Sequence, residues 1–582
     1  METKPELGVC YYPEHWPVEM WVDDAQRMVE MGLSWVRIGE FAWSRMEPKS
    51  GELTFDWLDD AIDVLASAGL KIIMCTPTAT PPRWMVDRYP DMLAWDKAGR
   101  VRGFGSRRHY DFSHLGYREE CVRIARILGQ RYGQRTAIRA WQIDNEYGCH
   151  DTTLSYSPVS RDAFRQWLKE KYGSIDALNQ RWGTVFWSME YNYFDQIDLP
   201  NLTVTEPHPA HVMDFRRFAS DQVVAFNRAQ AEVLRGLTKA DLLHNYMGRV
   251  TDFDHFALGQ DLDIATWDSY PLGFLEDRSN RSPDFQRKHA REGDADFQAF
   301  HHDLYRSIGR GRWWVMEQQP GPVNWAPHNP TPLAGQLRQW TLDAFDHGAE
   351  VVSYFRWRQL PFGQEQMHAG LLRPDGELSE GGKAVRDLGL ELESYSQPHN
   401  SPVDVAIIFD YASQWAWEVQ PHDRNFSYFR LVLDIYRGLR KQGYTRIDIL
   451  PPDTKDFADR KVVFIPGLFT WTDEMRNAID GFEGKVIIGP RTGSRTIDFH
   501  IPSEMPPGLE GLKVIAVDSL REDNPIKMHN AGYIQIWREV IETNWKAIAF
   551  TKENVPVVFK NNNIQYWAAW PDPDALELWL SL

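Results

Sequence analysis

Two glutamates stand where apolar, strand-like runs give way to polar residues. Glu146 follows Ile138–Ile143 within DNEYG, and Glu317 follows Arg312–Met316 within EQQPG. Two carboxyl groups that face each other can cleave a glycosidic bond, because one donates a proton while the other attacks the anomeric carbon. Asn145 adds an amide suited to a sugar hydroxyl group. A single glutamate after a strand is more often a solvated loop residue or a helix cap, so the prediction depends on both meeting at one site.

The runs that carry these glutamates belong to a longer series of eight strand-like segments. The series is Leu7–Tyr12, Ser34–Ile38, Lys71–Thr76, Ile138–Ile143, Asp241–Met247, Asp263–Tyr270, Arg312–Met316 and Val351–Phe355. Most are β-branched or aromatic-rich and almost continuously apolar, as buried parallel strands are. Amphipathic helices between them predict a closed (β/α)₈ barrel over residues 1–393. Active sites of such barrels lie at the carboxyl ends of the strands, which puts both glutamates at one rim.

Other segments complete the predicted organisation. The expected helices are Met20–Met31, Phe55–Ala68 and Glu119–Tyr132 in the barrel, with Arg161–Tyr172 and Asp176–Trp182 in a long insertion after strand four. A polar linker, Ser394–Pro402, is followed by a smaller α/β domain of doubly wound type over residues 403–582. Its expected elements are Val405–Phe409, Phe426–Lys441, Val462–Pro466, Lys485–Gly489, Val557–Lys560 and Ile564–Trp570. This domain has no phosphate-binding glycine motif, so we expect it to serve assembly or support.

Composition narrows the possible partners. The chain has 582 residues and a net charge of −18, which disfavours nucleic acid and anionic membranes as partners. Its 25 tryptophans suit stacking on sugar rings, although an aromatic-rich core accounts for them equally well. The four cysteines form no C-x-x-C pair. The first residues resemble no secretory signal, and no run is apolar enough to span a membrane, so a cytoplasmic location is expected.

Polar residues at other strand ends could assist the two glutamates. Arg37 or Arg108 could hold a nucleophilic carboxylate ionised, and Tyr270 could donate a hydrogen bond to it. For each residue taken alone, a buried ion pair or packing role is an equally good interpretation.

Seven ordered blocks of the sequence resemble glycoside hydrolase family 42, the bacterial β-galactosidases. They are YYPEHWP (11–17), RIGEFAWSRMEP (37–48), TPTATPPRW (76–84), FGSRRHYDF (104–112), WQIDNEYG (141–148), MEQQPGPVNW (316–325) and HAGLL (368–372). The match covers the whole predicted barrel. The second domain is similar to the trimerisation domain of that family, which implies a homotrimer.

The resemblance implies a role for individual residues. Glu146 would be the acid/base and Glu317 the nucleophile of a retaining β-galactosidase that releases terminal β-D-galactose by double displacement. The residues expected to bind the sugar are Arg108, Asn145, Trp187, Tyr270, Trp325, Phe355, Glu365 and His368. Among these, Glu365 and His368 would reach the hydroxyl group that distinguishes galactose. The family needs no organic cofactor.

Two features depart from the family pattern. Many members bind a structural zinc through four cysteines, but the corresponding positions here hold Asp111 and the run SYSPVS (155–160). Serine hydroxyl groups are poor zinc ligands, so we predict no metal at that site. The small C-terminal β-sandwich of the family is also expected to be absent from this chain.

Two alternative functions remain open at this stage. A related retaining hydrolase of the same barrel type could act on another sugar, as a β-glucosidase or an α-L-arabinosidase, because fold alone does not set the substrate. A non-catalytic sugar-binding protein is the third possibility, although such a protein is expected to have lost one of the two carboxylates.

Overall fold

The eight predicted strands close into one barrel. In the computed structural model, which describes residues 4–395, 403–457 and 459–582, parallel strands β1 to β8 follow one another around a ring. Their bounds are Glu6–Cys10, Leu33–Ile38, Lys71–Cys75, Ile138–Gln142, Asp241–Met247, Ile264–Ser269, Trp313–Gln318 and Val351–Tyr354. β8 pairs with β1, which completes the ring. The predicted barrel is confirmed, with one local correction: Glu317 lies inside β7 rather than after it.

Large side chains fill the barrel interior below the strand ends. A buried cluster from strands β2 to β8 comprises Trp35, Ile73, Ala140, Leu243, Ile264, Trp314, Met316 and Val351. The rings of Trp35 and Trp314 lie 4.8 Å apart between centroids. Their indole N–H groups donate to Glu6 and Glu350 at the amino ends of the strands. The interior is therefore a packed core that supports the opposite rim from below.

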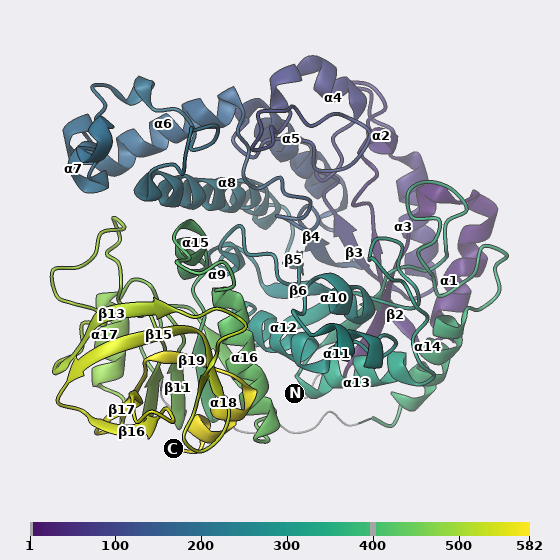
Figure 1. Cartoon of the computed structure of the whole chain (residues 1–582). Coiled ribbons are helices and arrows are strands. Elements are labelled where there is room, and N and C mark those ends of the chain that lie inside the picture. The colour runs from purple at the N-terminus through teal and green to yellow at the C-terminus, as the bar shows by residue number, and fades with distance from the viewer. Residues whose placement is uncertain (1–3, 396–402, 458) are drawn as a thin grey trace. The chain divides into compact units, whose positions relative to one another are not determined.

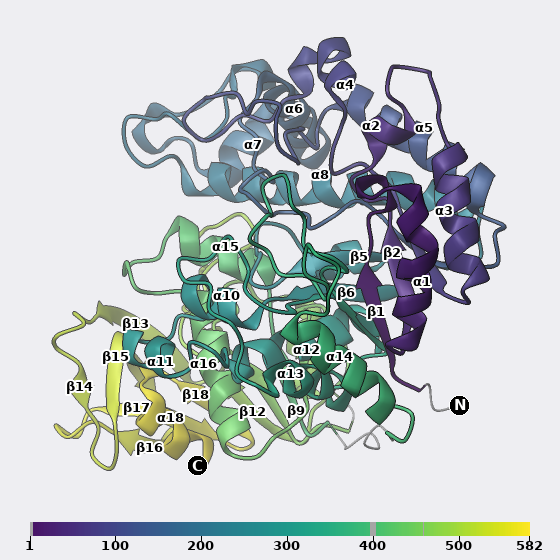
Figure 2. The same cartoon turned by 90° about the vertical axis from the view of Figure 1, so that its right-hand side faces the viewer.

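Helices surround the strands on the outside of the barrel (Figure 1). They include α1 (Trp21–Glu30), α3 (Asp56–Ser67), α5 (Leu115–Tyr132), α12 (Ala295–Ile308), α13 (Gln336–Asp346) and α14 (Glu380–Glu391). α1 packs against α3 and β2, and α13 packs against β8 and α14, as the turned view in Figure 2 also shows. Each helix turns its apolar face to the strands, as the alternation of burial along α1 illustrates.

Contacts divide the chain into two compact units. One unit comprises residues 1–164 and 218–400, and the other comprises residues 165–217 and 401–582. The insertion after β4 carries α6 (Pro158–Tyr172) and α7 (Ile175–Trp182), close to the predicted helices, and the long α8 (Pro209–Arg235). Most of the predicted linker, Ser394–Pro402, lies outside the described residues. In the ranges that are described, no helix is long and apolar enough to cross a lipid bilayer.

The second unit contains the mainly parallel sheet of the predicted α/β domain and an additional antiparallel sheet. The seven-stranded sheet has the order β10-β9-β11-β12-β18-β17-β16, with parallel strands from β10 to β18 and antiparallel strands at β17 and β16. The bounds are Val405–Ile408 (β9), Ile447–Leu450 (β10), Val462–Ile465 (β11), Lys485–Ile488 (β12), Lys546–Phe550 (β16), Pro556–Asn561 (β17) and Ile564–Trp567 (β18). Helices α15 (Tyr411–Val419), α16 (Tyr428–Lys441), α17 (Asp473–Asp480) and α18 (Pro573–Leu580) accompany the sheets.

The additional antiparallel sheet corrects one predicted strand. It is formed by β13 (Leu512–Ser519), β14 (Ile526–Lys527), β15 (Tyr533–Thr543) and β19 (Ala569–Pro571). The predicted strand Ile564–Trp570 is two strands, since β18 belongs to the first sheet whereas β19 pairs with β15. The chain changes sheets at Ala568, whose N–H still bonds to Val557 and whose carbonyl accepts from Glu539.

A buried hydrogen-bond cluster stands at the positions where the family often has zinc-binding cysteines. One carboxylate oxygen of Asp111 accepts from the hydroxyl groups of Ser157, at 2.5 Å, and Ser160, at 2.8 Å. The other oxygen accepts from the backbone N–H of Ser113 at 2.8 Å. Asp111, Ser157 and Ser160 are almost fully buried. The carboxylate therefore ties the start of α6 to the loop before α5 through neutral donors.

Replacing Asp111 by Ala is expected to lower the free energy of unfolding by about 2–4 kcal/mol, because three buried donors lose their acceptor. Thermal and denaturant unfolding measure this loss. D111N should lose less, since its amide oxygen still accepts, and D63A should change little because Asp63 forms an exposed ion pair with Arg135. A zinc chelator should leave the unfolding midpoint unchanged; a lower midpoint would contradict the predicted absence of zinc.

Candidate active site

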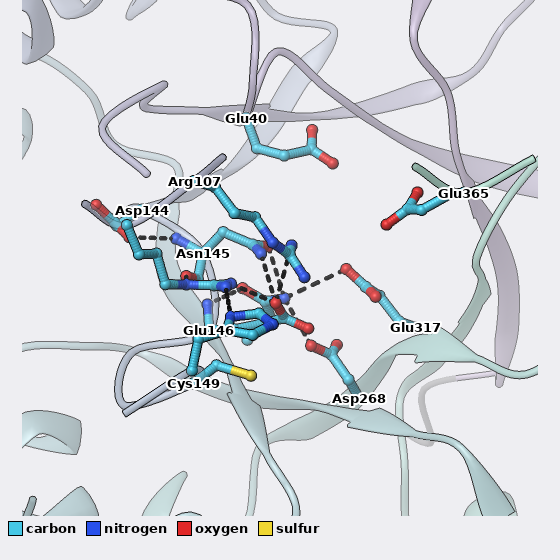
Figure 3. Close-up of polar contacts among 12 residues, drawn as sticks. Glu40, Arg107, Asp144, Asn145, Glu146, Cys149, Asp268, Glu317 and Glu365 are labelled. Carbon is cyan, nitrogen blue, oxygen red and sulfur yellow. Dashed lines mark hydrogen bonds and ion pairs between the residues drawn. The ribbon is translucent and has the colours of Figure 1, made fainter. Parts of the chain in front are cut away.

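Glu146 and Glu317 meet at the carboxyl ends of the barrel strands. One carboxylate oxygen of each, together with one of Asp268, lies within 4.8 Å of the others. Figure 3 shows the three side chains converging, Asp268 from β6, Glu317 from β7 and Glu146 from the turn after β4. Glu146 and Glu317 are each 3% exposed, so their carboxylates share one buried site. The predicted pairing of the two glutamates is thus present in the structure.

The turn that presents Glu146 has a strained backbone. Asp144 and Glu146 have φ angles of +56° and +50°, in the left-handed region that side chains disfavour. Hydrogen bonds hold this turn from several sides: the carboxylate of Asp144 accepts from the hydroxyl of Thr78 at 2.6 Å and from the N–H of Asn145 at 2.7 Å. The N–H of Tyr147 donates to the ring of His244. Strain that the surroundings maintain in this way is typical of functional sites.

Two guanidinium groups surround the carboxylate of Glu146. Arg108 donates a short hydrogen bond to Oε2, and Arg107 lies 3.0 Å from the same oxygen. The amide of Asn145 donates to it at 3.1 Å. Burial raises the pKa of Glu146, but Arg107 and Arg108 outweigh this effect and hold the pKa well below its usual range. Arg108 also donates to the carbonyl of Asn145 at 3.0 Å, which fixes its own position.

Glu317 is held by one cation and one phenol. Arg37 donates to Oε1 at 2.6 Å, and the hydroxyl of Tyr270 donates to Oε2 at 2.5 Å. Arg37 is fully buried and also pairs with Glu40 at 2.8 Å. Burial raises the pKa of Glu317, with Glu146 adding repulsion, while Arg37 and Tyr270 act in the opposite direction. Of the two candidate cations, Arg37 is therefore the partner of Glu317 and Arg108 is the partner of Glu146.

Aromatic residues that the sequence singled out gather beside Glu317. The rings of Tyr270 and Trp325 lie 5.7 Å apart, and His368 meets both Tyr270, at 5.8 Å, and Phe355, at 5.0 Å, edge to face. Trp325 is 39% exposed, so part of its ring can still contact a ligand. Burial lowers the pKa of His368 to about 4, which keeps the imidazole neutral near pH 7.

Glu365 lines a hollow of about 570 Å³ at the same rim, together with Arg107 and Arg356. Arg356, 3% exposed, pairs with Glu365 at 3.0 Å and stacks 4.3 Å from the ring of Tyr12. Trp187 belongs to the other compact unit and is 67% exposed. Its expected contact with a sugar stays a prediction.

Three residues beside Glu146 and Glu317 were not predicted from the sequence, namely Arg107, Asn245 and Asp268, and neither was Arg356, the partner of Glu365. Asp268 is fully buried, and its Oδ2 accepts from the amide of Asn245 at 2.8 Å. Asp268 lies on β6, two residues before Tyr270, which directly follows the strand. The two-residue period of a strand therefore places both side chains on the same side. That spacing could have predicted Asp268 from the sequence, and the adjacent arginines at 107 and 108 could have predicted Arg107.

The three carboxylates could in principle attract a metal ion. One oxygen from each of Glu146, Asp268 and Glu317 is a small donor set for a hard cation, which prefers six or more oxygens, several of them supplied by water. Guanidinium groups already bind Glu146 and Glu317. The surroundings therefore favour a hydroxyl-bearing organic substrate, whose groups can accept from arginine and donate to carboxylate.

Two family models match the chain. Residues 10–395 match the glycoside hydrolase family 42 β-galactosidase model, and residues 403–580 match the model of the β-galactosidase trimerisation domain. A β-galactosidase from Thermus thermophilus is 50% identical over 577 residues, which cover 98% of this chain and 89% of the relative. A β-galactosidase from Halorubrum lacusprofundi is 40% identical over 98% of this chain and 80% of its own length.

A solved structure agrees with these similarities. The crystal structure of a β-galactosidase from the psychrophilic Marinomonas ef1 is 48% identical and superposes with a TM-score of 0.96, over 99% of this chain and 90% of that one. Together with the paired carboxyl groups at the barrel rim, these matches show that the chain belongs to glycoside hydrolase family 42, the β-galactosidases.

Proposed function

We propose that the chain hydrolyses β-galactosides with retention of configuration, releasing terminal non-reducing β-D-galactose. The observation that carries this proposal is the approach of the Glu146 and Glu317 carboxylate oxygens to within 4.8 Å in one buried site. Carboxyl groups about 5 Å apart leave no room for a water molecule between the second carboxylate and the anomeric carbon, so that carboxylate must attack the carbon directly. Family membership supports galactose as the sugar.

In the first step, Glu317 attacks the anomeric carbon and Glu146 protonates the departing oxygen. Arg37 and Tyr270 stabilise Glu317 in its ionised form, which a nucleophile requires. In the second step Glu146, now ionised, takes a proton from water as the water displaces Glu317 from the sugar. This step leaves Glu146 protonated and Glu317 ionised, as they were at the start of the cycle.

Glu146 must carry a proton at the start of this cycle, although Arg107 and Arg108 favour its ionised form. Both arginines are also good donors to sugar hydroxyl groups, and we propose that Arg108 and Asn145 turn to the galactose when it binds. Once Arg108 and Asn145 bind the sugar, Glu146 loses part of the interactions that lower its pKa, so this pKa rises. Substrate binding would then create the acid that the first step needs.

The remaining predicted residues are proposed to hold the galactose ring. Trp325 and Phe355 offer apolar surfaces beside Tyr270, and Glu365 and His368 are proposed to recognise the hydroxyl group that distinguishes galactose from glucose. Trp187 is proposed to stack on the sugar.

We also propose that the protein assembles as a homotrimer and works in the cytoplasm. The match of residues 403–580 to a trimerisation domain supports an oligomer, and light scattering of the purified protein measures its mass directly. Four buried cysteines with free thiol groups are typical of a reducing compartment.

Replacing Glu317 by Gln is expected to lower kcat for β-galactosides by about a thousandfold or more, because an amide cannot attack carbon. Chromogenic galactosides, glucosides and arabinosides measure both the loss and the sugar preference of the wild type. E350Q is the matched control, since Glu350 binds Arg312 and Trp314 at the amino end of β8. Full activity of E317Q, or a wild type that prefers glucosides, would contradict the proposal.

Replacing Glu146 by Ala is expected to slow substrates with poor leaving groups by about a hundredfold or more, because only these need the proton. Nitrophenyl galactosides, which have good leaving groups, should lose much less in the first step. Steady-state rates for a series of leaving groups test this difference. Equal losses across the series would rule out an acid role for Glu146.

A further inference from the structure

The side chain of Asn245, on β5, contacts both Glu146 and Glu317. Its amide oxygen accepts from the backbone N–H of Glu146 at 3.3 Å, and its amide nitrogen donates towards Oε1 of Glu317 at 3.4 Å. The same nitrogen donates to Oδ1 of Asn145 at 2.8 Å and to Oδ2 of Asp268 at 2.8 Å. Asn245 is fully buried, so all of these contacts are shielded from water.

These neighbours allow only one orientation of the amide. Three acceptors, from Asn145, Asp268 and Glu317, surround its nitrogen, and one donor, the N–H of Glu146, faces its oxygen. A flipped amide would point its oxygen at three other oxygens and leave the Glu146 N–H without its acceptor. Asp268 contributes most firmly to this choice, because no guanidinium group among the described residues forms an ion pair with its carboxylate.

We propose that Asn245 is a positioning residue that sets the relation between Glu146 and Glu317, and that Asp268 fixes its amide. The inference rests on the proposed retaining mechanism. On one side, Asn245 holds the backbone of the strained turn at Glu146, where φ is +50°. On the other, it supplies a neutral donor to the oxygen of Glu317 that Arg37 also binds. A shift of either group would change the gap across which the sugar reacts.

The electrostatic surroundings of Glu317 give this role a measurable signature. The titratable groups that face it are Cys10 on β1, Arg37 on β2, Glu146 after β4, Asp268 on β6 and Tyr270 after β6, with Glu40 and Arg107 one contact further away. A donated N–H stabilises the ionised form of Glu317, so its loss raises the pKa of this nucleophile. The acid limb of kcat/KM, which reports ionisation of the free enzyme, must then move to higher pH.

Replacing Asn245 by Ala tests the proposal in the full-length protein. We expect kcat for a nitrophenyl β-galactoside to fall about ten- to a hundredfold, with a smaller change in KM, and the acid limb to move to higher pH. N245D should move the limb further in the same direction, because a carboxylate replaces the donor beside Glu317. T341V is the matched control: it removes a buried hydrogen bond between α13 and Tyr354, and its acid limb should stay in place.

Variants of Asp268 provide a second test of the proposal, one that does not depend on whether N245A folds. D268N keeps both the size of the side chain and an oxygen that can accept from Asn245, so it should lose less activity than D268A. D268A removes the acceptor and should reproduce the behaviour of N245A. Thermal unfolding of every variant shows whether the fold is preserved.

Two results would overturn the inference. One is a folded N245A whose acid limb does not move, since a packing role alone lowers rate without changing ionisation. The other is a folded D268N that loses as much activity as D268A. Failure of the proposed function looks different, because in that case the wild type does not hydrolyse galactosides or E317Q remains active.

Discussion

The balance between buried carboxylates and buried guanidinium groups governs this site. Arg37 lies between Glu40 and Glu317 without contact with water, and Arg107 and Arg108 converge on one oxygen of Glu146. Burying an ionised group is unfavourable unless opposite charge and hydrogen bonds surround it. The closed barrel satisfies this condition, because β2, β6, β7 and the segments after β3 and β4 bring cations and anions from different directions to one site. The tryptophan-filled interior below holds those strand ends in register.

The same balance gives the two glutamates distinct environments. Glu317 is bound by one cation and one neutral phenol, whereas Glu146 faces two cations whose donors also suit hydroxyl groups. The ionisation of Glu146 therefore depends on what else those two arginines bind, while the ionisation of Glu317 is largely set by the protein. Two identical side chains can divide acid and nucleophile roles in this way without any difference in their own chemistry.

Much of the barrel was predictable because buried parallel strands leave nearly continuous apolar runs, such as Lys71–Cys75. The two glutamates were predictable because strand ends of a barrel share a rim. The sheet formed by β13 and β15 was missed because its strands are only half-buried and carry charged residues between apolar ones. The contacts of Asn245 and the choice between Arg37 and Arg108 as the partner of Glu317 could not be predicted, since both depend on how segments far apart in sequence are placed at the barrel rim.

Some residues at the rim are held by strands and others by a loop, and this difference affects which parts of the sequence can change. Glu146 and Glu317, the proposed proton donor and nucleophile, are anchored by β4, β5, β6 and β7, whereas Glu365 and His368 come from a loop beyond β8 that contacts this group only at its edge. Under the sugar-recognition role proposed for that loop, insertions or exchanges in it alter which sugar epimer is accepted while the two glutamates keep their spacing. Natural variation and laboratory recombination should accordingly tolerate new sequences after β8 far more readily than on the inward face of β5.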